Sequence, residues 1–289
     1  MFRYPKKSAR PEPRRGTAFI IVAAAIIGLG IPSGAQYVKY PTAGVPRTAA
    51  GKVNMSAPTP RTADGKPDLS GLWLTANPWC PTGYDANSGL CGLELPMGLD
   101  GINLGRTLQG GLPYQPWLAK LVKERTASDS KDDPHVRCLP DTFLRAYSLP
   151  HILKIVQTPG LLIMLSEVNA SYRQVFTDGR PLPIDPTPSW QGYSTAKWDG
   201  DALVIDSAGF RDGLWIDWNG SEIGESAKVR ERITRPEYGH LNIEVTVDDP
   251  KAYTKPWTVT VHQRIMPDTD LIEFVCQENS KDGPHLVGK

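Results

Sequence analysis

The second half of this sequence is built of short segments in which apolar and polar residues alternate, and this pattern restricts the fold most. In HLNIEVTV at 240–247 every second residue is apolar, and 256–265 repeats the pattern. A period of two places one face of a strand against a core and the other in water. We therefore predict about ten strands. Their expected ranges are 69–75, 152–157, 161–167, 171–177, 192–198, 201–207, 227–234, 240–247, 256–265 and 271–277.

The connections between these segments indicate how the strands pair. Asp199-Gly200 lies between two alternating runs and is a strong hairpin signal. Most connections are short, so neighbouring strands are expected to pair antiparallel, and closure into a barrel protects the edges of a long meander. We predict a mainly β fold, an antiparallel up-and-down barrel of about ten strands. A two-sheet sandwich is the alternative, for which only the connections 178–191 and 208–226 are long enough to cross over.

The segment before the strands predicts one or two short helices in an N-terminal extension. Pro116 suits a first helical turn, and Trp117, Leu118, Leu121 and Val122 share one face. Residues 139–150 are expected to form a short helical turn. The strand at 161–167 is apolar on both faces, so we expect the helix around Trp117 to cover it. The predicted domain spans 66–289, with a loop and helix insertion at 76–150.

The N-terminus predicts export. Residues 1–16 are basic, residues 17–30 form an apolar run of about fourteen, and Ser33-Gly34-Ala35 offers small residues for cleavage before Gln36. We predict a signal peptide at 1–35 and a periplasmic or secreted protein. An uncleaved anchor is the alternative, although a spanning helix needs about 20 apolar residues. The Pro-, Thr- and Gly-rich residues 36–65 are expected to form a flexible linker or arm.

Four cysteines in an exported chain favour disulfides. Cys80 and Cys91 lie close together in a Gly-rich loop, so we expect them to pair, which leaves Cys138 with Cys276. A metal site is the alternative for His135-x-x-Cys138, but that spacing supplies only two ligands. We predict no metal site.

Charge and motifs exclude several classes of function. Without residues 1–35 the chain has 26 basic and 30 acidic side chains, because that segment holds 6 of 32 and 1 of 31. A net charge of −4 argues against nucleic-acid binding, which needs a basic face. No Gly-x-Ser-x-Gly motif is present, and no Gly-rich phosphate loop follows a strand. We therefore predict no cofactor and no nucleic-acid partner.

The alternation also predicts what the barrel encloses. With polar residues outside, the inner wall is apolar, which suggests an internal cavity for an apolar or amphipathic small molecule. Arg173 and Glu231 fall in the apolar register, as does Gln263. The first two are candidate polar anchors for a ligand. They are equally compatible with a satisfied structural ion pair.

Aromatic residues gather in the hairpin region, and a cavity mouth can use them to stack on a ring. The candidate walls of the ligand site are Tyr193, Trp198, Trp215 and Trp218. Packing as core and barrel plugs is the alternative. The apolar loop 208–224 is the candidate lid or rim.

Three functions are compatible with these patterns. The first is a barrel that binds a small molecule. The second is an acid/base enzyme (a hydratase, isomerase or lyase) in the same cavity, with His240 and Glu167 as a base and its orienting partner and Arg173 stabilising negative charge. The third is an accessory subunit of an envelope complex, suggested by the arm at 36–65.

Gly71-Leu72-Trp73 resembles the Gly-x-Trp signature of lipocalins, in which the Trp closes one end of the barrel. This resemblance implies a lipocalin- or calycin-like barrel, although the chain is longer and residues 76–150 have no counterpart there. The blocks PTPRTADGKPDLSGLW, KDDPHVRCLP, FTDGRPLP, WDGDALVIDSAGF and DDPKAYTKPW are similar to blocks of a large, mostly uncharacterised family of secreted bacterial proteins. That resemblance implies export and a single domain, and no catalytic residues.

Overall fold

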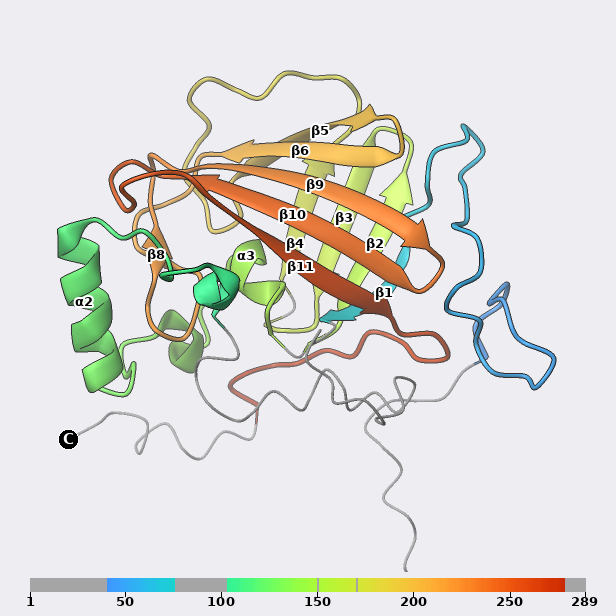
Figure 1. Ribbon diagram of the computed structural model, residues 1–289, viewed down its shortest axis with the longest axis horizontal. Coiled ribbons are helices and arrows are strands. Elements are labelled where there is room, and N and C mark those ends of the chain that lie inside the picture. Colours follow the sequence, from blue (N-terminus) through green and yellow to red (C-terminus); the bar gives the residue numbers. More distant parts are fainter. Residues whose placement is uncertain (1–40, 76–102, 150, 170, 279–289) are drawn as a thin grey trace, which may run out of the picture. The chain divides into compact units, whose positions relative to one another are not determined.

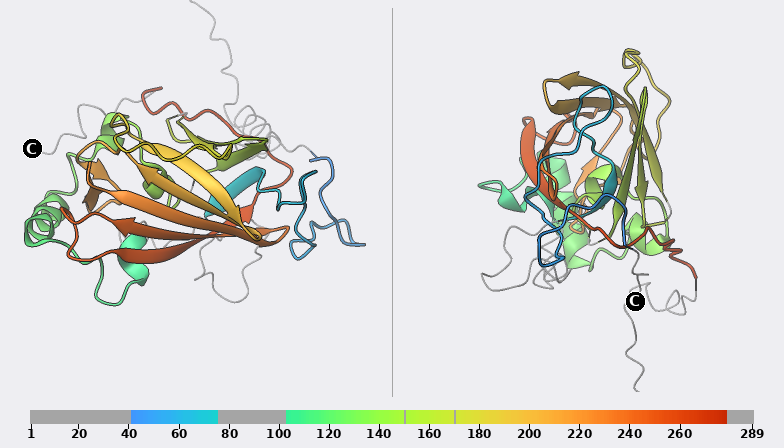
Figure 2. Two further views of the ribbon diagram at one scale, coloured as in Figure 1. Left: turned by 90° about the horizontal axis from the view of Figure 1, so that it is seen from above. Right: turned by 90° about the vertical axis from the view of Figure 1, so that its right-hand side faces the viewer.

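The described part of the chain forms a closed β-barrel of nine strands (Figures 1 and 2). The structure is a computed structural model that describes residues 41–75, 103–149, 151–169 and 171–278. The strands are β1 (Gly71–Thr75), β2 (Leu153–Thr158), β3 (Leu161–Ser166), β4 (Tyr172–Phe176), β5 (Tyr193–Asp199), β6 (Ala202–Ala208), β9 (Lys228–Glu237), β10 (His240–Asp248) and β11 (Trp257–Ile265). Their order around the barrel is β1-β11-β10-β9-β6-β5-β4-β3-β2. The predicted mainly β barrel is confirmed, and the sandwich alternative is excluded.

Short elements complete the described chain. They are η3 (Leu104–Thr107), α2 (Pro116–Ala127), η4 (Pro134–Arg137), α3 (Phe143–Ala146) and the hairpin β7 (Leu214–Trp215) with β8 (Glu222–Ile223). Helix α2 begins at Pro116, as predicted. In the described residues no helix is long and apolar enough to cross a membrane.

The expected strand at 271–277 does not join the barrel. Strand β1 pairs with both β11 and β2, so the sheet is already closed and offers no edge to a tenth strand. Of the segment, only Phe274 makes a bridge, to Val168.

One pair of neighbouring strands departs from the antiparallel pattern. Strands β4 and β5 run parallel and share only two residue pairs, Val175 with Ser194 and Phe176 with Thr195. The connection between them carries four prolines, at 181, 183, 186 and 188. Because proline has no backbone N–H for a ladder, this connection returns along the barrel without adding an antiparallel strand. We call the two-pair contact the seam.

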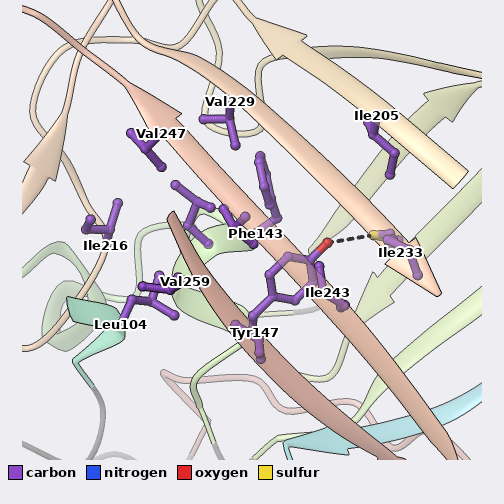
Figure 3. Close-up of a cluster of buried hydrophobic side chains, with 14 of the residues drawn as sticks. Leu104, Phe143, Tyr147, Ile205, Ile216, Val229, Ile233, Ile243, Val247 and Val259 are labelled. Carbon is purple, nitrogen blue, oxygen red and sulfur yellow. Dashed lines mark hydrogen bonds between the residues drawn. The ribbon is translucent and has the colours of Figure 1, made fainter. Parts of the chain in front are cut away.

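The inward-facing side chains fill the part of the barrel where a cavity was expected. Leu241, Ile243, Val245 and Val247 are all fully buried, as the alternation predicts. Helix α3 then inserts Phe143 and Tyr147 among them, and Figure 3 shows both rings surrounded by strand side chains. The lumen next to α3 is therefore packed with side chains, because a helix enters it from the segment before β2.

Trp73, the central residue of β1, is part of the buried core. Its side chain is fully buried, and its indole N–H donates to the carbonyl of Leu69 over 3.1 Å. The guanidinium of Arg235 lies 4.9 Å from the ring centroid and donates to the carbonyls of Asp68 and Tyr238.

Helix α2 does not cover β3. Its Arg125 contacts Glu222 at 2.6 Å and lies 4.5 Å above the Trp215 ring, while Trp117 donates to the carbonyl of Lys251. The helix therefore packs on the β7–β8 hairpin and the β10–β11 connection. The outward-facing apolar residues of β3 remain half-buried.

The arm is ordered on the barrel over its described residues and contains a repeat. The pattern P-R-T-A-x-G-K occurs at 46–52 and again at 60–66. Each copy forms a β-bridged turn, closed by Arg47–Val53 in the first and Arg61–Pro67 in the second. We call these turns the first clasp (46–53) and the second clasp (60–67). Sequence analysis missed this repeat.

The two clasps use the same local structure and the same anchor. Gly51 and Gly65 have φ of 76° and 79°, a left-handed conformation that favours glycine. In each clasp the Arg side chain donates to the carbonyl of that Gly. The same guanidinium then forms a two-bond ion pair with a barrel carboxylate, which is Asp268 for the first clasp and Asp201 for the second. Residues 46–67 are thus held against the barrel, where a flexible arm was expected.

A disulfide joins Cys138 to Cys276, and the two cysteines are separated by 138 positions in the sequence. This confirms the predicted pair and fixes the chain after β11 to the segment after η4. The predicted pair of Cys80 and Cys91 lies outside the described residues.

Candidate ligand-binding site

Arg173 and Glu231 lie together in the barrel interior, with only 2% and 0% of their side chains exposed. Two guanidinium nitrogens contact the two carboxylate oxygens. The remaining N–H groups reach the hydroxyls of Tyr147, Ser194 and Ser207 at 3.0–3.2 Å. Every donor of the guanidinium therefore has a partner within the protein. The geometry therefore favours a structural ion pair between Arg173 and Glu231 over a role of these two residues as ligand anchors.

Tyr147 completes this buried cluster. Its hydroxyl donates to a Glu231 oxygen over 2.6 Å, and the Glu231 charge adds to the effect of burial, which raises the pKa of Tyr147 well above its usual value. The tyrosine therefore remains a neutral donor. Through it the ion pair fixes α3 inside the barrel.

His240 and Glu167 are not brought together. The His240 imidazole contacts Glu237 at 2.7 Å, whereas Glu167 lies 3.7 Å from His151 and accepts from the backbone N–H of Ile152. In the sheet, β11, β1 and β2 lie between β10 and β3. The expected base and its orienting partner thus belong to two separate contacts.

Trp215 and Trp218 lie in loop 208–224, which is largely buried. Ile216, Asp217 and Ser221 are fully buried there. Trp215 packs beneath Arg125, and the Trp218 ring lies 6.4 Å from the His135 ring. The loop is therefore part of the core at the α3 end of the barrel, and the interpretation as a lid or rim is wrong. Its apolar residues reflect burial by α2, α3 and the β10–β11 connection.

Trp198 lines a pocket at the other end of the barrel, next to the seam. We call it the mouth pocket; it has a volume of about 460 Å³. It is lined by Thr62, Ala63, Asp64, Gln157, Thr158, Pro159, Gly160, Leu162, Thr177, Trp198 and Leu203. Strand pairing places Trp198 opposite Leu203 and Gln157 opposite Leu162, all four on the inward-facing side.

The mouth pocket offers an apolar wall with little free hydrogen-bonding capacity. The Gln157 amide is occupied by the N–H of Leu69 and the carbonyl of Pro67. The half-buried Trp198 supplies the exposed apolar surface, and the fully buried Leu162 and Leu203 pack behind it.

The second clasp forms the outer wall of this pocket. Its Lys66 ammonium lies 5.9 Å from the centroid of the Trp198 ring. A hydrogen bond from Thr62 lowers the pKa of Asp64, and one from Arg61 lowers the pKa of Asp201, so both carboxylates at the rim are ionised. The rim therefore carries two cations and two anions, which leave it near neutrality.

Tyr193 lines a second cleft on the other side of the seam, which we call the seam cleft. Its volume is about 490 Å³, and Arg173 and Ser194 form part of its floor. Of the predicted wall residues, Trp198 and Tyr193 thus line open space, in two different pockets.

A cluster of charged side chains positions α3. The predictions from the sequence did not include this cluster. The buried Arg145 makes two hydrogen bonds of 2.6–2.7 Å to Asp133 and lies 3.3 Å from Asp141, which contacts His135 at 2.7 Å. In the sequence these residues lie in two turns on either side of Cys138 and suggest only loop polarity. The available signal was an acidic residue four positions before Arg145. In the described residues no cluster of three or more possible metal ligands occurs.

The fold and the two pockets define a closed, mixed β-barrel with ligand-sized openings on both sides of its single parallel seam. No family model matches the chain, and no curated protein matches it. The resemblance to secreted bacterial proteins therefore stays a prediction, and function is argued from the geometry.

Proposed function

We propose that this protein binds a small apolar or amphipathic molecule in the mouth pocket. One observation carries the proposal: the half-buried Trp198 indole borders open space at the barrel end, above the fully buried Leu162 and Leu203. The volume of about 460 Å³ lies within the range of about 300–1,000 Å³ that is usual for small-molecule sites.

The charged groups at the rim give the ligand its orientation. The apolar part of the ligand packs on the Trp198 indole, while a polar end stays near Lys66 and Asp64. Stacking on an aromatic ring adds about 0.5–1.5 kcal/mol to the free energy of area burial. This arrangement favours an amphipathic ligand over a wholly polar one.

The second clasp controls access. Its outer anchor is the ion pair of Arg61 with Asp201, and both side chains are about half exposed or more. Exposed ion pairs are weak because water screens them. Displacement of the clasp tip around residues 61–66 would therefore cost little, while Pro67 stays bonded to Gln157 of β2.

A titration with the neutral fluorophore 1-aminoanthracene tests the proposal. We expect Trp198→Ala to weaken binding about threefold to tenfold, since stacking and apolar area are both lost. Trp117→Ala is the matched control, because Trp117 is 48% exposed on α2. Equal affinities for the two variants would contradict the proposal.

The acid/base alternative has lost its proposed residues, since His240 and Glu167 occupy separate contacts. Both clasps form ion pairs with other residues of this chain. The arm therefore has a structural role that does not require an envelope partner.

We also propose that the protein is exported to the periplasm or beyond. The disulfide between Cys138 and Cys276 supports this, because such bonds persist in oxidising compartments. The intact mass of the exported protein tests it. We expect a chain that begins at Gln36, and a retained Met1 would contradict cleavage.

A further inference from the structure

We infer that the seam cleft is a second binding site, for a neutral sugar ring, independent of the mouth pocket. Strand β5 begins at Tyr193 and, on its β4 side, pairs only with the last two residues of β4. The start of β4 is therefore left without a neighbour on that side, and the cleft lies there. It is lined by Pro140, Asn169, Ser171, Tyr172, Arg173, Gln174, Phe176, Ser189, Trp190, Gln191, Gly192, Tyr193 and Ser194. Three observations define the chemistry of its ligand.

The first observation is the absence of usable charge. Among the described residues that line the cleft, Arg173 alone is charged, and Glu231 behind it neutralises that charge. Its N–H groups are all engaged within the protein. The floor of the cleft therefore offers no free charge to a ligand. Two arginines lie at its rim against the Phe176 and Trp190 rings, Arg180, which is paired with Asp178, and Arg211. A neutral ligand loses less hydration on contact with this floor than a charged one.

The second observation is a set of aromatic faces. Tyr172, the first residue of β4, is 62% exposed, since β5 pairs only with the last two residues of that strand. Phe176 and Tyr193 stack at 5.2 Å, and Arg180 covers the Phe176 ring at 3.9 Å. Their positions are thus fixed, whereas the Tyr172 ring is open to a ligand. An exposed ring next to a cleft is a platform for the apolar face of another ring.

The third observation is a set of side-chain amides in the wall of the cleft. Gln191 donates from Nε2 to the carbonyl of Asp141 over 2.7 Å, while its Oε1 is buried and accepts no hydrogen bond from the described residues. Asn169 and Gln174 add two more side-chain amides to the same wall. Gln191 Oε1 is closed off from the cleft, but the exposed amide of Gln174 is free to exchange hydrogen bonds with ligand hydroxyls, so a ligand that supplies hydroxyl groups is preferred to a hydrocarbon.

A neutral pyranose ring meets all three conditions. Its C–H face packs on an aromatic ring, and its hydroxyls donate to and accept from amides. The polar neighbours of the cleft distinguish this site from the mouth pocket, where the amide of Gln157 is already occupied. The two sites therefore differ in ligand class.

Saturation-transfer NMR with maltohexaose, cellohexaose and chitohexaose tests the inference, with hexagalacturonate as the charged comparison. We expect at least one neutral oligosaccharide to bind in the millimolar range, and the charged one to bind more weakly. Tyr172→Ala should weaken this binding about threefold to tenfold, and Gln174→Ala should weaken it less. Both side chains are exposed, so the variants should fold normally.

Controls separate this site from the mouth pocket. Trp117→Ala and Trp198→Ala should bind the sugar like the unmodified protein, and 1-aminoanthracene should not displace it. Failure of all three neutral sugars to bind would overturn the inference. So would equal binding by Tyr172→Ala, or displacement by 1-aminoanthracene. None of these outcomes bears on 1-aminoanthracene binding itself, so the two proposals fail separately.

Discussion

At the scale of single residues, the interior of this barrel is held by a few polar side chains whose partners come from distant segments. Arg173 on β4 meets Glu231 on β9 and Tyr147 next to α3. Each of these groups is completely or almost completely buried, so each depends on the others for hydrogen bonds. Substitution of one partner leaves a charge that neither water nor protein compensates.

Glu231→Gln should lower the free energy of unfolding by about 3–5 kcal/mol, because it leaves the Arg173 charge buried without a counter-charge. Urea denaturation measures the change. Arg232 lies next to Glu231 on β9 and forms an exposed ion pair with Asp199 of β5. Arg232→Gln removes this pair and should leave the midpoint nearly unchanged. The double variant Arg173→Met/Glu231→Leu should recover most of the loss. Similar midpoints for Glu231→Gln and Arg232→Gln would contradict this account.

Asp217 gives a pH-dependent prediction. Burial raises the pKa of its carboxyl, and its Oδ2 has no partner among the described residues. A raised folded-state pKa means that stability is greatest below the unfolded value of about 4 and falls as the pH rises through the folded-state pKa. Asp217→Asn removes this penalty. The variant should therefore gain stability relative to the unmodified protein between pH 4 and pH 7.

Urea denaturation at pH 4, 5.5 and 7 measures this gain. Asp185→Asn is the control, because it makes the same chemical change at an exposed loop position. A difference between Asp217→Asn and the unmodified protein that stays constant across these pH values would show that Asp217 is not the responsible group.

At the scale of elements, the two clasps are one structural motif used twice. Each has a glycine in the left-handed region, an arginine bonded to that glycine carbonyl, and an aspartate on the barrel as anchor. Only the second clasp lines the mouth pocket. The repeat thus provides a matched pair in which one member serves as the control for the other.

Asp201→Asn should speed the association of 1-aminoanthracene with the mouth pocket, because the second clasp loses its ionic anchor. Asp268→Asn loosens the first clasp in the same way and should leave the association rate unchanged. Stopped-flow fluorescence measures both rates. An equal acceleration in the two variants would show that the second clasp does not control entry.

At the scale of the whole molecule, the barrel is closed with one weak seam and a covalent tie. The seam contributes two residue pairs, whereas β10 and β11 share eight. The disulfide joins Cys138, in the segment between β1 and β2, to Cys276, in the segment after β11. Both pockets lie beside the seam, where the sheet leaves room for them.

Cys276→Ser should destabilise the protein by about 2–5 kcal/mol, since the disulfide closes a long loop in the unfolded chain. Thermal unfolding of the purified variant measures the loss. A reductant should lower the midpoint of the unmodified protein and leave that of Cys138→Ser/Cys276→Ser unaffected. A variant with an unchanged midpoint would contradict a structural role for the bond.

The sequence alone was sufficient to predict the β class, all nine barrel strands, the start of α2 and the pairing of Cys138 with Cys276. These features depend on local alternation, turn residues and a small number of possible partners, all of which can be read along the chain. The P-R-T-A-x-G-K repeat was equally local and was overlooked.

Only the tertiary structure decided what occupies the barrel and where the pockets lie. Arg173 and Glu231 are 58 residues apart, and the sequence cannot show that they neutralise each other. The insertion of α3, the burial of loop 208–224 and the parallel seam follow from long-range packing. The energy of such contacts depends on which segments meet in space, and a linear pattern does not contain that information.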